Sequence, residues 1–108
     1  MEKIDYKYSE DLLIPELKAY IDKTYEEHYA QARIQTTEFI IDNGHGVGFT
    51  VGNIMKYAQR YGKKAGRNRQ DILKVLHYGI MLLHTHDMEV GKPEVETNEK
   101  QCEKDYKK

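Results

Sequence analysis

One stretch of the chain, residues 72–83, carries apolar side chains around a wide part of a helical surface. They recur at helical spacing as Ile72, Leu73, Val75, Leu76, Gly79, Ile80, Leu82 and Leu83. Ahead of them, Asn68 is a good N-cap residue, and Asp71 three positions later resembles the acidic partner of a capping box. The stretch therefore predicts a central core helix, which the rest of the chain must cover.

The remaining helical signals are shorter. We expect a first helix from about Pro15 to His28, a second from Thr37 to about Asp42, and a third that is capped by Thr50 and ends near Gly62. A glycine-rich loop, residues 43–49, should precede the third helix. No stretch shows sustained strand alternation, so the predicted fold is all-α, a compact bundle of about four helices.

Length and composition limit the organisation further. With 108 residues the chain has room for one domain, which we place at residues 1–90, and residues 91–108 are polar enough to predict a flexible tail. The single cysteine, Cys102, excludes an intrachain disulfide and a cysteine-based zinc site. No secretory signal and no membrane-spanning run is visible, so we expect a cytoplasmic protein without membrane contact.

Charge is distributed unevenly along the chain. Residues 1–48 carry 5 basic and 10 acidic side chains, whereas residues 49–78 carry 7 basic side chains and only Asp71 as an acid. A basic middle in an otherwise acidic chain favours a local anion site, and direct binding to DNA is not expected. Alternatively, the basic segment faces the acidic segment, within one chain or across an oligomer.

The basic segment begins with glycines that allow a ligand to approach the backbone, among them Gly46 and Gly48, and it continues into a predicted helix N-terminus. One face of that helix carries Asn53, Lys56, Arg60 and Lys63 or Lys64. Arginine and lysine at this spacing are suited to binding one or two phosphates. The segment matches neither a Walker A loop nor a dinucleotide-binding fingerprint. The alternative is a glycine-rich turn beside a solvated basic face.

Other chemistry-bearing residues give weaker signals. Glu38 and Asp42 are spaced to face the same way and could hold Mg²⁺, although a solvated helix face is the favoured interpretation. The histidines show no metal-ligand spacing, so we predict no metal site. His28 and His77 are candidates for ligand contact, or else histidines with structural roles.

Taken in order, several short motifs resemble a family of small tailed-phage proteins long listed as of unknown function. The family signature reads roughly HY, GNxxKYxxRxxxK and DLxKxxxY, and the corresponding stretches here are His28-Tyr29, Gly52–Lys64 and Asp71–Tyr78. The resemblance covers about residues 28–83. The chain departs from the family pattern in two respects: its segment before Gly52 is richer in glycine, and it has no proline near Glu38.

Some members of that family are described as nucleotide kinases, so the resemblance implies phosphoryl transfer to deoxynucleoside monophosphates in the cytoplasm of an infected host, with ATP as a candidate donor. For such an enzyme we expect the phosphates to be bound by Lys56, Arg60, Lys63 and Lys64, with a hydrogen bond from Asn53 and a stacking surface from Tyr57 or Tyr78. No general base is obvious, and His28 and His77 are the best candidates. A nucleotide-sequestering protein and a helical adaptor that inhibits a host protein remain alternatives. Nine tyrosines and a small core also predict a homo-oligomer.

Overall fold

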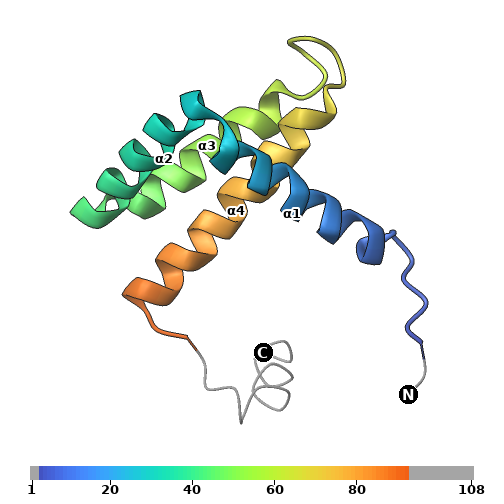
Figure 1. The fold of residues 1–108 in the computed structure, drawn as a ribbon, viewed down its shortest axis with the longest axis horizontal. Coiled ribbons are helices and arrows are strands. Elements are labelled where there is room, and N and C mark those ends of the chain that lie inside the picture. The colour runs from blue at the N-terminus through green and yellow to red at the C-terminus, as the bar shows by residue number, and fades with distance from the viewer. Residues whose placement is uncertain (1–2, 93–108) are drawn as a thin grey trace.

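A computed structural model describes residues 3–92, except for the side chains of residues 28–30. The elements are α1 (Glu10–Glu26), α2 (His28–Ile40), a π-type segment η1 (Ile41–His45), α3 (Gly46–Arg60) and α4 (Arg69–Glu89) (Figure 1). Residues 3–92 contain no strand, which confirms the all-α prediction. Because α2, η1 and α3 follow one another without a gap, residues 3–92 form three helical stretches, and the predicted count of four is not supported.

The predicted glycine-rich loop is not supported, because residues 46–49 belong to α3 and Gly44 alone is non-helical inside η1. Gly44 (φ +86°) makes the bend inside η1, and α3 begins at Gly46, four residues before the expected cap Thr50. Thr50 instead lies buried inside the helix, where its hydroxyl donates a hydrogen bond of 2.8 Å to the Gly46 carbonyl. Tertiary packing of this first turn outweighs the low helix propensity of its glycines.

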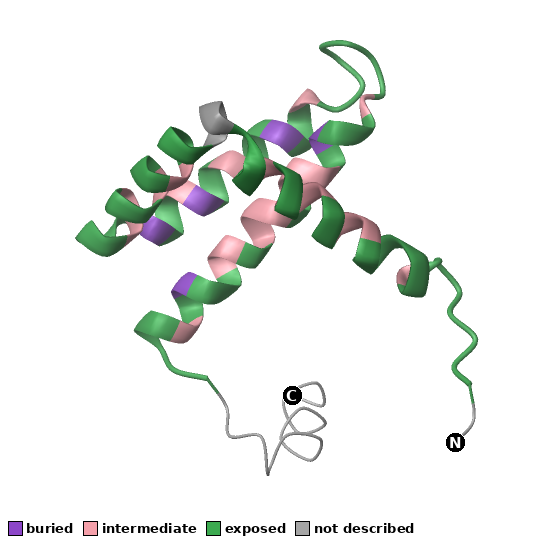
Figure 2. Cartoon of the chain, viewed as in Figure 1, coloured by how far each residue is buried: buried purple, intermediate pink, exposed green. Residues whose placement is uncertain are grey.

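The α3–α4 pair forms the most closely packed part of the molecule. A Cβ atom on Gly46 would lie 2.9 Å from Cγ2 of Thr85, so glycine is what allows the two helices to cross this closely. Thr50, Tyr57, Asp71 and Thr85 are buried along the same pair of helices (Figure 2). The most deeply buried side chains of this contact, Thr50, Asp71 and Thr85, are small or polar.

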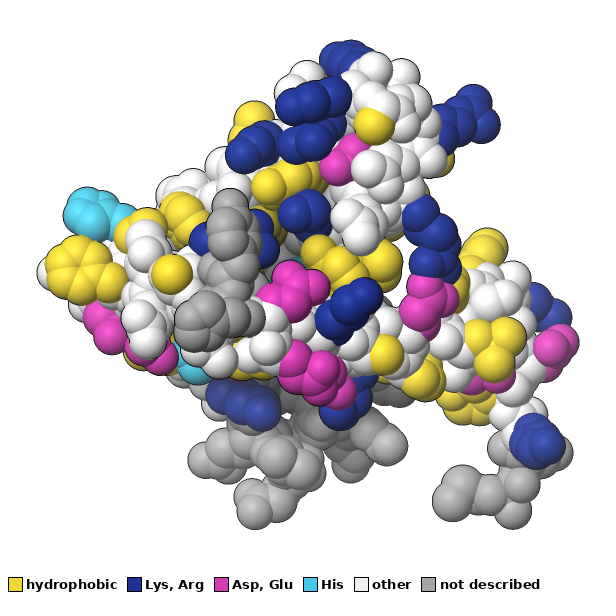
Figure 3. Space-filling view, turned by 45° about the horizontal axis from the view of Figure 1, so that its top comes forward, with side chains coloured by type: hydrophobic (Ala, Val, Ile, Leu, Met, Phe, Trp, Pro, Cys, Tyr) yellow, Lys and Arg dark blue, Asp and Glu magenta, His cyan; other side chains and the backbone are white. Residues whose placement is uncertain are grey.

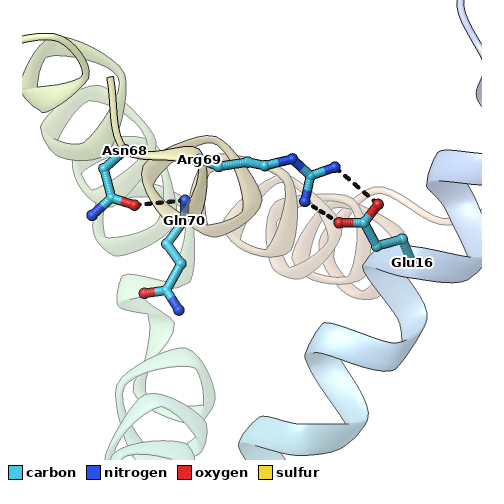
Figure 4. A network of polar contacts seen from close by, with 4 residues as sticks. All are labelled: Glu16, Asn68, Arg69 and Gln70. Atoms are coloured by element: carbon cyan, nitrogen blue, oxygen red, sulfur yellow. Dashed lines mark hydrogen bonds and ion pairs between the residues drawn. The ribbon is translucent and has the colours of Figure 1, made fainter. Parts of the chain in front are cut away.

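Helix α1 crosses α4 and is joined to it at two points (Figure 1). The Arg69 guanidinium donates two hydrogen bonds to the Glu16 carboxylate (Figure 4). Farther along, the rings of Tyr20 and His77 meet edge to face at 6.3 Å between centroids. Helix α1 begins five residues earlier than expected, with Pro15 inside it; its first turns carry exposed leucines and so give no periodic signal.

The start of α4 confirms one half of the predicted cap. The Asn68 side chain accepts a hydrogen bond of 3.0 Å from the Gln70 backbone N–H (Figure 4). Asp71 does not act as the capping-box partner, because its carboxylate is buried beside Arg60 instead.

The molecule is more open than the compact bundle that the sequence predicted. Its radius of gyration is 16.4 Å, whereas a compact domain of this length has about 13 Å. Among the described residues, Tyr57 is the only large apolar side chain that is buried. Half of the residues expected in the core stripe are exposed. These are Ile72, Leu76, Ile80 and Leu83, which keep 43–62% of their surface accessible to solvent.

Within the described residues, no helix is both long and apolar enough to cross a membrane. Of the predicted tail, residues 91–108, all but the first two residues lie outside the described part of the chain.

Candidate functional site

An open pocket of about 440 Å³ lies where α2, α3 and α4 meet. Helix α2 contributes Ala32, Arg33, Thr36 and Thr37, helix α3 contributes Phe49, Asn53, Lys56 and Tyr57, and helix α4 contributes Tyr78. The described lining contains two cations, three aromatic rings and no carboxylate. We call this hollow the Tyr57–Tyr78 pocket.

Aromatic rings form one wall of the pocket. Tyr57 and Tyr78 stack with centroids 6.0 Å apart and planes only 12° from parallel, and Phe49 meets Tyr78 edge to face at 6.0 Å. Tyr57 is 8% exposed, so the stack is held firmly by its surroundings. Phe49 and Tyr78 are less buried, and they offer flat rings on which a nucleobase can stack.

Three cations surround the Tyr57 ring. The Nζ atoms of Lys56 and Lys74 lie 5.0 and 5.2 Å from its centroid, and the Arg60 guanidinium carbon lies 5.8 Å away. Cations at these distances are attracted to the ring face. No ion pair joins Lys56 or Lys74 to a carboxylate in the described part of the chain. Their mutual repulsion makes this place favourable for an anion.

A second, smaller hollow of about 50 Å³ adjoins the pocket through three shared residues, Arg33, Thr37 and Tyr78. It is also lined by Tyr20 and Lys74. Burial raises the pKa of both the Tyr20 and the Tyr78 hydroxyl, and the nearby Arg33 charge partly offsets both increases. Arg33 therefore lies close to both rings, between the two hollows.

His77 lines the smaller hollow beside Lys74 and Tyr20. Burial lowers its pKa from the ordinary value of 6.5. The imidazole is therefore mainly neutral at pH 7, the form that can accept a proton.

The fold brings four of the predicted site residues together at the Tyr57–Tyr78 pocket: Asn53, Lys56, Tyr57 and Tyr78. Asn53 is held in place by a hydrogen bond of 2.9 Å from its Nδ2 to the Phe49 carbonyl. His77 lies next to them in the adjoining hollow.

The other predicted residues lie elsewhere. Gly46 packs against Thr85, Gly48 sits in the first turn of α3, and Lys63 and Lys64 are exposed in the turn after α3. None of them lines the pocket, and Gly46 and Gly48, which were expected to let a ligand approach the backbone, lie outside it. The side chain of His28, at the start of α2, is not among those the structure describes.

Arg60 points toward α4. Its Nε atom lies 3.7 Å from Oδ1 of Asp71, whose side chain is 3% exposed. Neither that Nε nor the second carboxylate oxygen of Asp71 has a hydrogen-bond partner within the described structure. Figure 3 shows Lys and Arg side chains gathered toward the end where α3 passes into α4. Arg60 is the last residue of α3.

Sequence reasoning missed Arg33, Lys74 and Tyr20 as site residues. Two spacings could have indicated Arg33 and Lys74, but not Tyr20: Arg33 and Thr37 are four residues apart on α2, and so are Lys74 and Tyr78 on α4. The predicted pair Glu38 and Asp42 is exposed, and no cluster of three or more metal-ligating side chains exists among the described residues.

A family profile described as a protein of unknown function, DUF3310, matches residues 23–79. The chain belongs to the DUF3310 family. The matched region includes part of α1, all of α2 and α3, and the part of α4 that carries Lys74, His77 and Tyr78. It therefore contains the whole lining of the Tyr57–Tyr78 pocket. No curated protein and no solved structure matches the chain. The function must therefore be argued from the pocket.

Proposed function

We propose that the Tyr57–Tyr78 pocket binds a nucleotide, with the base near the stacked tyrosines and the phosphates among the surrounding cations. The observation that supports this most directly is the convergence of Lys56 and Lys74 on one buried tyrosine ring, with Arg33 close to the neighbouring Tyr78. Lysine and arginine complement phosphate charge, and a pocket without a carboxylate does not repel it.

We further propose that the reaction at this site is phosphoryl transfer from ATP to a deoxynucleoside monophosphate. The terminal phosphoryl group of ATP would move to a phosphate oxygen of the acceptor and leave ADP and a deoxynucleoside diphosphate. Such catalysis consists mostly of positioning and charge neutralisation, for which Lys56, Lys74 and Arg33 are suitable. Because the acceptor is already a phosphate, the reaction does not depend on His77 as a base.

A second candidate is nucleotide binding without turnover. The lack of a carboxylate in the described pocket lining favours it, because Mg²⁺ in phosphoryl transfer is commonly held by one or two carboxylates together with the substrate phosphates. This candidate uses the same cations and the same aromatic stack.

The binding site can be tested with three single substitutions. Lys56→Gln and Lys74→Gln each remove a cation beside Tyr57, whereas Lys63→Gln removes one from the same basic segment outside the pocket. Hydrogen bonds to charged groups are worth about 1.5–3 kcal/mol, so calorimetric affinity for ATP or a deoxynucleoside monophosphate should fall roughly 10- to 150-fold in the first two variants. Lys63→Gln should bind like the unchanged chain.

If Lys63→Gln loses affinity and the two pocket variants do not, the nucleotide binds along the basic turn and the pocket assignment is wrong. Turnover is tested separately by incubating ATP with each deoxynucleoside monophosphate and separating the products by chromatography. Formation of a diphosphate that Lys74→Gln abolishes supports the kinase proposal. Intact binding without any product establishes the second candidate.

A further inference from the structure

Helix α4 presents apolar side chains on two opposite sides. One side, which includes Tyr78 and Thr85, packs against α3. The other carries Ile72, Leu76, Ile80 and Leu83, all exposed. A helix with apolar residues on both sides is normally covered on both sides. The described part of this chain leaves these four side chains 43–62% exposed, although Ile80 also borders a hollow between α1, α2 and α4.

We propose that this exposed side of α4 pairs antiparallel with the same side of a second copy of the chain. The outer stripe, as we call it, runs along one helical face with steps of three or four residues: Arg69, Ile72, Leu76, Ile80, Leu83 and Asp87. Such spacing is that of the seam between two paired helices. The stripe is apolar in its middle, basic at its start and acidic at its end.

The charge order selects both the occupant and its direction. Arg69 and Asp87 lie equally far from position 78, and so do Leu76 and Ile80. An antiparallel copy centred there places Arg69 opposite Asp87 of the partner subunit, and Leu76 opposite Ile80 of the partner subunit. A parallel copy would instead place like charges together. In a two-fold dimer, each of these favourable contacts occurs twice.

The pairing is compatible with what the fold already uses. Arg69 donates to Glu16 within its own chain, but a guanidinium has five N–H donors and can contact a second carboxylate. The Tyr57–Tyr78 pocket lies on the α3 side of α4, so a partner on the outer stripe leaves it open. The proposal therefore does not depend on the nucleotide site.

The test is the mass of the full chain in solution, measured by analytical ultracentrifugation at tens of micromolar. The unchanged chain should have at least twice the 12.7 kDa of one copy. Leu76→Glu/Ile80→Glu should reduce that mass, with circular dichroism confirming that the helices remain. The control Val51→Glu/Met55→Glu adds the same charges at the same spacing on exposed positions of α3 and should leave the mass unchanged.

The antiparallel direction has its own test. In a homodimer of Asp87→Arg, each new arginine faces Arg69 of the partner subunit, which gives two repelling pairs. Arg69→Glu likewise places a glutamate opposite Asp87 of the partner subunit at both ends. The dimer dissociation constant of each variant alone should therefore rise at least tenfold. Mixing the two variants restores opposite charges at both ends and should restore the dimer. A monomeric unchanged chain, a mass that the Leu76/Ile80 variant does not reduce, or a mixture no tighter than its components would overturn the proposal.

Discussion

Arg60 shows why a basic face read from sequence does not identify the phosphate ligands. By spacing it belongs with Lys56 on one side of α3, but in the fold its guanidinium lies beside the buried carboxylate of Asp71. That carboxylate comes from α4, and nothing in the local pattern around Arg60 indicates it. Lys56, whose ammonium lies over Tyr57 with no described ion-pair partner, is the residue of that face that the structure places at the pocket.

Replacing Arg60 should therefore affect stability. Arg60→Ala leaves the Asp71 carboxylate buried without its cation, and an unsatisfied buried group costs about 1–3 kcal/mol. Urea unfolding should show a loss of that size, and Asp71→Asn in the same chain should recover part of it because the buried charge is then removed. Lys63→Ala, an exposed change on the same segment, should have little effect. Unchanged stability in Arg60→Ala would show that water or another group already satisfies Asp71.

At the scale of helices, boundaries that carry a local chemical signal were predicted better than boundaries that carry none. Asn68 identified the start of α4, and the end of α3 at Arg60 lies two residues before Gly62 as expected. The first turns of α2 and α3 were missed because α2 has almost no apolar stripe and α3 begins in glycine. Their helical state depends on packing against other elements, which sequence periodicity does not contain.

The residues of the candidate site also fall into two groups: those that the sequence indicated and those that only the arrangement of the helices brings in. Asn53 and Lys56 were found because they share one face of a predicted helix, and Tyr57 and Tyr78 through a family resemblance. Arg33 and Tyr20 come from α2 and α1, so their approach to Tyr78 depends on how three helices are arranged.

The closest approach of α3 and α4 can be tested at Gly46. In Gly46→Ala the new methyl group would lie 2.9 Å from Cγ2 of Thr85, and overpacking of this kind costs about 1–3 kcal/mol. Gly52→Ala is the matched control, because its methyl group meets nothing within 4 Å and alanine should stabilise the helix by about 0.5–1 kcal/mol. Thermal melts should shift down for the first variant and up for the second. A rise in both would mean that the helices separate easily.

At the scale of the whole molecule, composition correctly indicated a thin core. The chain has few apolar residues, its radius of gyration of 16.4 Å is large for its length, and most large apolar side chains keep a substantial exposed surface. The sequence could not show which side of α4 would remain uncovered, because residues 72–83 are apolar nearly all round. Only the position of α3 separates the packed side from the outer stripe.

The bridge between Arg69 and Glu16 also has a consequence for the order of folding. It joins positions 53 residues apart, whereas α3 and α4 are separated by a short turn, residues 61–68. Closing a long loop costs more chain entropy than closing a short one, so α3 and α4 should pair first and α1 should dock last. In stopped-flow experiments Gly46→Ala should then mainly slow folding, and Tyr20→Ala should mainly speed unfolding. The smaller hollow, which needs both α1 and α4, would form only in that final step.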